Sequence, residues 1–310
     1  PAGGEDAGGG ADGATPSLAR QTGKPRRMAQ YGRNEWRRPP EDPGVQENEE
    51  LRGEWIKFIN ADMLKALFPV RVGSMECGEA GVAALSAVLA DASYADAVLE
   101  HLDLVCKWIT LRLCEREHSR ALAGLLGFIE ALLARLRDRG YVLEDAEQRI
   151  LVPWLLEKSG FAKERFRRQM RGILELAFAV MPSANYAVMA TEALQSRNGR
   201  SRIVCLEEMR RITELDSPSG PLTLKKAAAR QVGRLLDARE TEVRQGALAV
   251  AAAIFAKVGD ANKVLRFLGG DALSETSKGL FLEKIRRIEA LTGGGGGGGT
   301  SSPAKKASPE

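Results

Sequence analysis

Helical periodicity recurs along almost the whole interior of this 310-residue chain, in segments joined by short connections. The segment NEELRGEWIKFINADMLKALF, residues 48–68, places Leu51, Trp55, Ile59 and Met63 on one stripe at helical spacing. A shorter apolar segment, GEAGVAALSAVLAD, follows it. No segment shows the period-two alternation that is typical of strands. The pattern therefore predicts an all-α fold built from helical hairpins.

The same arrangement repeats about six times, with a repeat length of about 35 to 45 residues. After the first hairpin, the remaining ones are expected over residues 96–140, 145–182, 183–216, 221–259 and 261–292. A hairpin of this length buries its apolar face only by stacking on its neighbours. We therefore expect an α-solenoid. Trp55, Trp108 and Trp154 lie on the apolar stripes and are expected in its core.

The two ends of the chain have a different composition. Residues 1–48 are rich in Gly, Ala, Pro and charge, and residues 292–310 contain a run of glycines, so both are expected to be disordered linkers around a domain at 49–291. Between Arg20 and Arg38, seven basic residues stand against Glu35 alone. This run is either a solvated spacer or a segment attracted to an acidic polymer surface.

Composition excludes several classes of function. The four cysteines lack CxxC spacing, and the two histidines belong to no ligand motif, so no metal site and no cofactor are expected. No nucleophile motif or phosphate-binding glycine loop is present, and we do not expect an enzyme. No run of about 18 apolar residues predicts a membrane span. The net charge of +4 is too small to require nucleic acid as a partner.

The short connections inside the hairpins carry more cationic charge than a turn needs. The connection QSRNGRSR contains Arg197, Arg200 and Arg202 and no acidic residue. Other connections supply Phe68 with Arg71, Lys158 with Lys163, and Arg239 with Arg244. In a stacked array such connections emerge together along one edge, which is a ready surface for binding a partner.

Four segments, QSRNGRSRIVCLEEMRR, HLDLVCKWITLRLCE, GILELAFAVMPSANY and LDARETEVRQGAL, resemble the TOG domains of the multi-TOG microtubule polymerases, most of all the fourth domain. The resemblance covers residues 36–291. It implies six HEAT repeats, sister TOG domains in a longer chain, and a place in the cytoplasm on microtubules and the spindle. It also implies binding of αβ-tubulin or the microtubule lattice through the loops inside the repeats. The candidate tubulin-binding residues are Phe68, Arg71, Lys158, Lys163, Arg197, Asn198, Arg200, Arg202, Arg239 and Arg244.

One other function is compatible with the sequence pattern, and a second fits it less well. The chain could be a generic HEAT-repeat scaffold that binds a protein other than tubulin. Nucleic-acid binding would need a denser basic stripe with interleaved aromatic residues than these connections offer. We expect neither nucleic acid nor a membrane as a partner.

Overall fold

The computed structural model describes residues 17–18, 23–31, 45–69, 75–114, 119–215 and 226–293. Within these ranges the regular secondary structure is helical, and the one isolated β-bridge joins Leu18 to Ile59. The prediction of an all-α fold is therefore confirmed. The chain divides into two compact units, Pro1–Cys205 and Leu206–Glu310, and each is described by itself.

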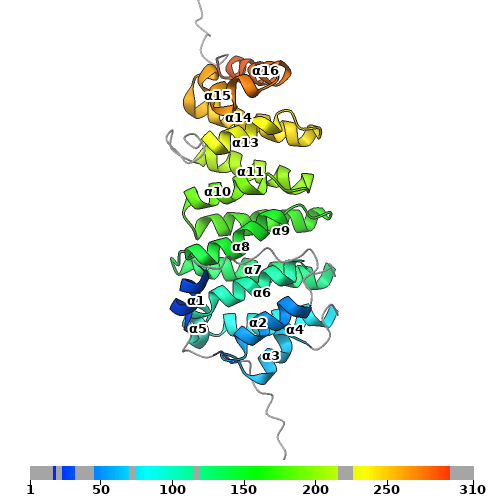
Figure 1. The fold of residues 1–310 in the computed structure, drawn as a ribbon, viewed down its shortest axis with the longest axis vertical. Helices are drawn as coiled ribbons and strands as arrows, with labels where there is room; N and C mark the ends of the chain where they lie inside the picture. Colours follow the sequence, from blue (N-terminus) through cyan, green and yellow to red (C-terminus); the bar gives the residue numbers. More distant parts are fainter. Residues whose placement is uncertain are drawn as a thin grey trace, which may run out of the picture. The chain divides into compact units, whose positions relative to one another are not determined.

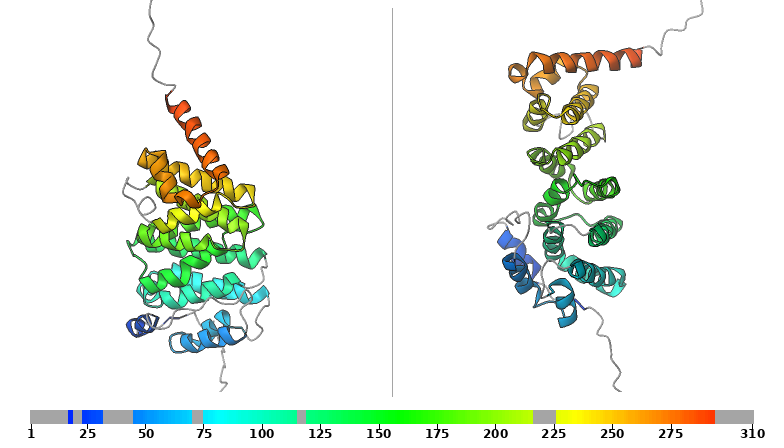
Figure 2. Two further views of the ribbon diagram at one scale, coloured as in Figure 1. Left: turned by 45° about the horizontal axis from the view of Figure 1, so that its top comes forward. Right: turned by 90° about the vertical axis from the view of Figure 1, so that its right-hand side faces the viewer.

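The first unit is a stack of helices in two layers (Figures 1 and 2). In one layer α2 packs against α6, α6 against α8, and α8 against α10; in the other layer α4 packs against α7, and α7 against α9. The helices of this unit are α1 (Lys24–Tyr31), α2 (Val45–Trp55), α3 (Ala61–Leu67), α4 (Met75–Ala90), α5 (Ala95–Glu100), α6 (Leu102–Cys114), α7 (Ser119–Asp138), α8 (Asp145–Glu157), α9 (Glu164–Ala179), α10 (Ser183–Ala193) and the beginning of α11 (Gly199–Leu215).

The second unit contains the rest of α11, followed by α13 (Lys226–Leu235), α14 (Thr241–Val258), α15 (Ala261–Leu268) and α16 (Glu275–Gly293). Helix α13 packs against α14 and α15, and α16 packs against α14. A Cβ atom at Gly233 would lie 1.8 Å from the carbonyl oxygen of Leu268, so only glycine allows α13 and α15 to approach this closely.

The core holds the three tryptophans that the periodicity placed there. Trp55 and Trp108 are fully buried and Trp154 is nearly so. The indole Nε1 of Trp108 donates a hydrogen bond to the carbonyl oxygen of Leu67 at 3.1 Å, which satisfies its polar atom. Helix α6 is unusual because all its side chains from Leu102 to Leu113 are buried, the charged ones included.

One helix boundary differs from the sequence pattern, and another agrees with it. The continuous helix expected over residues 48–68 is broken into α2 and α3, because the Asn60 side chain accepts a hydrogen bond from the Met63 backbone N–H and begins a new helix. At the end of α7, Gly140 has a φ of 65°, the left-handed conformation that ends many helices.

The N-terminal linker prediction differs from the structure over Lys24–Tyr31, which forms α1 (Figure 1, dark blue). Lys24 is buried, and its ammonium lies 2.8 Å from the carboxylate of Glu147. A partner more than a hundred residues away leaves no trace in local composition, and composition was the basis of the linker prediction. Most of the two predicted linkers, including residues 1–16 and 294–310, lies outside the described residues.

Candidate functional site

The α8–α9 and α10–α11 connections of the first unit lie at the same end of two parallel helices. At the beginnings of these helices, Asn185 Nδ2 donates to Gln148 Oε1 at 2.9 Å. Beyond their ends, the Ser196 hydroxyl donates to Glu157 Oε1 at 3.1 Å. Because α8 and α10 run side by side in the same direction, the connections that follow them emerge at one edge. We call this edge the loop edge.

The two connections are in direct contact. The Ser201 hydroxyl, in the first turn of α11, donates to the carbonyl oxygen of Glu157 at 2.6 Å. A Cβ atom at Gly160 would lie 2.5 Å from the backbone nitrogen of Ser201, so any larger residue at position 160 would force the two segments apart. The loop edge is therefore one continuous surface rather than two independent loops.

The turn before α11 is shaped by its short polar side chains. The backbone N–H of Asn198 donates to the Ser196 hydroxyl, and the backbone N–H of Arg200 donates to Asn198 Oδ1, both at 3.0 Å. Asn198 thereby caps a donor that the first turn of the helix leaves unpaired. Asn198, a predicted contact residue, shapes the turn through this hydrogen bond.

The cations of this edge differ in exposure. Arg197, Arg200 and Lys163 are exposed, whereas Lys158 and Arg202 are half-buried. Among the described residues, no ion pair or hydrogen bond involves the guanidinium of Arg197 or of Arg200. The Lys163 ammonium contacts the hydroxyl of Ser119, the first residue of α7. The turn before α11 thus presents two guanidiniums to solvent, and the adjoining α8–α9 connection adds the exposed side chain of Lys163.

In each unit, one arginine near the start of a helix donates hydrogen bonds to carbonyl oxygens of the connection that precedes the helix. We call this arrangement an arginine clamp. In the first unit, Arg167 Nη1 donates to the carbonyl oxygens of Phe161 and Ala162 at 2.8 and 2.9 Å. In the second unit, Arg244 Nη1 donates to the carbonyl oxygens of Ala238 and Arg239, both at 2.8 Å. Each guanidinium reaches back five and six residues in the same way.

This clamp changes the interpretation of Arg244, which the sequence analysis named as a contact residue. Its guanidinium is used to hold the turn before α14, while Arg239 in that turn is exposed. The equivalent Arg167 was not foreseen. The signal that identifies both is an arginine three residues after the first residue of the second helix of a hairpin.

The connection that follows α3 offers less exposed surface for a partner than the sequence suggested. Phe68, expected as an aromatic contact, is only 8% exposed, and its backbone N–H donates to Leu64 at the end of α3. A ring with so little accessible surface has little area to offer a partner. Arg71 lies outside the described residues.

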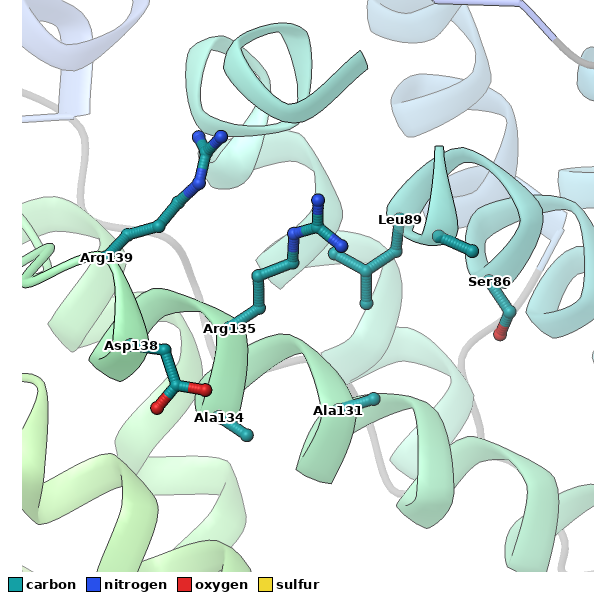
Figure 3. A pocket seen from close by; sticks show the side chains of 8 residues that line it. Ser86, Leu89, Ala131, Ala134, Arg135, Asp138 and Arg139 are labelled. Carbon is teal, nitrogen blue, oxygen red and sulfur yellow. The ribbon is translucent and has the colours of Figure 1, made fainter. Parts of the chain in front are cut away.

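Two hollows in the first unit complete the picture. One lies between α8 and α10 next to the loop edge and is lined by Arg149, Trp154, Glu157, Glu192 and Ser196, among others. The other lies between α4 and α7, with Arg135 and Arg139 beside small residues of α7 (Figure 3). Within the described ranges, no three His, Cys, Asp or Glu side chains gather in a way that could hold a metal ion.

No single helix in the described part of the chain is long and apolar enough to cross a membrane. One bent pair, Gly78–Ala90 with Ala92–Glu100, passes that test of length and composition only when its two helices are taken together.

Known proteins provide a comparison for this arrangement. No family model matches the chain. The protein MOR1 of Oryza sativa subsp. japonica is 29% identical over 189 residues, and mini spindles of Drosophila melanogaster is 30% identical over 191 residues, which are 61% and 62% of this chain. Zygote defective protein 9 of Caenorhabditis elegans is 31% identical over 192 residues, or 61% of this chain. The matches span only 9%, 9% and 13% of these relatives' own lengths.

Two solved structures have the same fold. The TOG domain of C. elegans Zyg9 superposes with a TM-score of 0.74 at 23% identity, covering 87% of this chain and 98% of that domain. A second structure, from work on TOG–tubulin binding specificity in microtubule dynamics and mitotic spindle formation, gives a TM-score of 0.71 at 25% identity, covering 81% of this chain and 99% of its own. The chain therefore has the HEAT-like helical-repeat fold of TOG domains, as predicted from its sequence.

Proposed function

We propose that this chain is a tubulin-binding module that contacts the αβ-tubulin heterodimer or the microtubule lattice through the loop edge. The observation that carries the proposal is the pair of exposed guanidiniums of Arg197 and Arg200, held on a capped turn in a fold shared with TOG domains. Lys163 on the adjoining connection extends the cationic surface.

The physical basis of recognition is charge presented on a rigid support. The surface of tubulin is acidic, and a guanidinium forms two parallel hydrogen bonds with a carboxylate. The Asn198 cap and the Ser201–Glu157 hydrogen bond fix the turn before a partner arrives. Less conformational entropy is then lost on binding, which favours affinity.

At the level of the longer protein, we propose that the module works as the fourth TOG domain of a microtubule polymerase. Sister domains joined by flexible linkers would raise the local concentration of tubulin near a growing end. The expected place of work is the cytoplasmic cytoskeleton, on microtubules and the spindle. The similarity to MOR1, mini spindles and Zygote defective protein 9 supports this proposal.

The test is direct binding of the full chain to purified brain tubulin. Size-exclusion chromatography with unpolymerised tubulin detects heterodimer binding, and co-sedimentation with stabilised microtubules detects lattice binding. We expect binding in at least one assay, weakening as salt rises from 50 to 300 mM because exposed charges are screened. Absence of binding in both would favour the alternative of a HEAT-repeat scaffold for a different protein.

A further inference from the structure

A second set of charged contacts lies at the edge of the first unit where α6 and α8 begin, away from the loop edge. Helix α1 lies across this edge, next to α5 and the start of α8 (Figure 1). It is joined to α2 through residues 32–44, which lie outside the described ranges. The contacts of α1 come mainly from two cations at helical spacing, Lys24 and Arg27.

Lys24 enters a pocket of oxygen atoms. Its Nζ lies 2.8 Å from Glu147, 2.9 Å from Glu144 and 3.0 Å from the Tyr141 hydroxyl, and it donates to the carbonyl oxygen of Leu99 at 3.0 Å. The Glu147 side chain is fully buried beneath it. Burial alone would lower the pKa of Lys24, because it disfavours the charged ammonium. Hydrogen bonds to Glu147 and Tyr141 stabilise the ammonium and outweigh this effect, so the pKa of Lys24 is raised above its usual range.

Arg27 fills a second pocket, one helical turn further along α1. Its Nε and Nη2 donate to the two carboxylate oxygens of Asp103, each at 2.8 Å, and Nη2 also donates to the carbonyl oxygen of Glu100 at 3.1 Å. The Asp103 side chain is fully buried. The guanidinium also lies over the ring of Phe58, 5.1 Å from its centroid.

The rest of α1 contributes little to this contact. Lys24 is the one buried side chain described in this helix, and Arg27 and Met28 are half-buried. The side chains of Pro25, Arg26, Ala29 and Gln30 are exposed. Leu18, upstream, is buried and pairs its backbone with Ile59. By contrast, α2 anchors itself with the buried side chains of Leu51 and Trp55 and belongs to the core. The attachment of α1 is therefore mainly electrostatic, whereas that of α2 is mainly apolar.

The acidic pockets around Glu147 and Asp103 require a particular spacing between the two cations of a segment that fills both. Asp103 and Glu147 each lie in the first turn of a helix, where the helix dipole favours a carboxylate, and both are buried, so each needs a cation. Residues three apart share one face of a helix, so a Lys-x-x-Arg segment in helical form can enter both pockets together. Arg26 lies between the two cations in sequence but points to solvent.

We propose that this edge is a binding site for a helical Lys-x-x-Arg segment, occupied by α1 of the same chain, Lys24–Tyr31, and able to exchange that helix for an identical one supplied in trans. The cis segment is favoured because its tether gives it a high effective concentration. Docking holds the segment that precedes the repeats at the edge opposite the proposed tubulin contacts.

A peptide of residues 17–31 carrying a fluorophore tests the proposal against the full chain. The Lys24→Gln/Arg27→Gln chain frees the pockets, and we expect it to bind the peptide about tenfold more tightly or better than the wild-type chain does, because the wild-type site is filled. A peptide with both Gln substitutions should not bind. A peptide with Arg26→Gln is the matched control and should bind like the native one. Failure of the native peptide to bind a variant that melts cooperatively would overturn the proposal.

A second experiment avoids dependence on that variant. A protease cleavage sequence is inserted between residues 32 and 44 of the otherwise wild-type chain, and the chain is then cut. We expect the released N-terminal piece to co-elute with the repeats at low salt and to be displaced by excess native peptide, but not by the double-Gln peptide. A piece that separates at once, or that the native peptide cannot displace, would show that α1 is not an exchangeable ligand.

Discussion

The two edges of the first unit use the same residue types for opposite purposes. Where α6 and α8 begin, Lys24 and Arg27 face buried carboxylates of their own chain. At the loop edge, Arg197 and Arg200 face solvent, and no ion pair involves their guanidiniums among the described residues. The comparison teaches that a cation's role is decided by what the fold places opposite it, not by how many cations are neighbours in sequence.

The two situations also differ in energy. Removing one member of a buried ion pair typically costs about 3–5 kcal/mol, because the other charge is left without a partner. An exposed pair contributes roughly 0–1 kcal/mol. Substitutions at the edge where α6 and α8 begin should therefore change the stability of the fold, and substitutions at the loop edge should change binding of the partner.

The largest effect is expected for Glu147→Lys. The carboxylate of Glu147 binds Lys24 and also accepts the backbone N–H of Glu144 at 2.8 Å, so its replacement removes a cap and places two ammonium groups together. We expect a loss of about 3–5 kcal/mol in the free energy of unfolding, measured by urea denaturation. Glu192→Lys, a reversal on an exposed residue of α10, is the control. Equal stability of Glu147→Lys and wild type would remove the distinction between the two edges.

The next effect concerns binding at the loop edge. Arg197→Glu/Arg200→Glu should leave the melting temperature unchanged and weaken tubulin binding by about tenfold or more, which is about 1.4 kcal/mol or more. Arg202 is left out because it is half-buried. Arg210→Glu is the control, since Arg210 pairs only with Glu214 on the surface of α11 among its described contacts. Full binding by a double variant that melts normally would exclude these two arginines from the site.

A smaller effect is expected for the arginine clamp. Arg244→Met removes two hydrogen bonds to carbonyl oxygens that water can replace, so we expect a loss of about 1 kcal/mol in unfolding free energy. Arg239→Met, on an exposed residue of the same turn, should cost less than about 0.5 kcal/mol. If Arg239→Met destabilised the chain more than Arg244→Met, the clamp interpretation would be wrong.

The last prediction is a pH dependence of the stability of the Lys24→Gln variant. Burial raises the pKa of Glu147, and Lys24 opposes that rise; Tyr141 and Glu144 also face the carboxyl group. Without the ammonium the pKa of Glu147 should rise further. A carboxyl whose folded pKa is raised stabilises the fold at low pH and loses that contribution as pH increases through the raised pKa. The stability deficit of the variant should therefore grow between about pH 5 and 8, by at most about 1.4 kcal/mol per pH unit. A deficit that shrank over this range would contradict the assignment.

Much of the fold follows from apolar spacing, because a helix records its buried face in the local sequence. The three core tryptophans and the layered hairpins were predictable in this way. The break between α2 and α3 at Asn60 depends on a single capping hydrogen bond, and the periodicity of apolar residues does not reveal such a bond. The docking of α1 was not predictable, because the hydrogen-bond partners of Lys24 and Arg27 lie 73 or more residues away along the chain.

The site was predictable only in part, for a related reason. An arginine in a connection is expected near the surface, and Arg197 and Arg200 are exposed. Whether a guanidinium is engaged depends on backbone carbonyl groups whose direction the sequence does not record, as with Arg244 and the unforeseen Arg167. Phe68 shows the opposite case, an aromatic residue in a connection that is nevertheless buried.

Gly160 has a consequence for the spacing of the repeats. Because backbone meets backbone at Ser201, the separation of two successive hairpins at this edge is set by main-chain dimensions and not by the size of any side chain. Side-chain substitutions elsewhere on the loop edge can change its charge without changing its pitch. The contact therefore fixes the spacing of the two hairpins at this edge. A partner whose binding groups recur at a fixed interval meets the same spacing whichever side chains the loop edge carries.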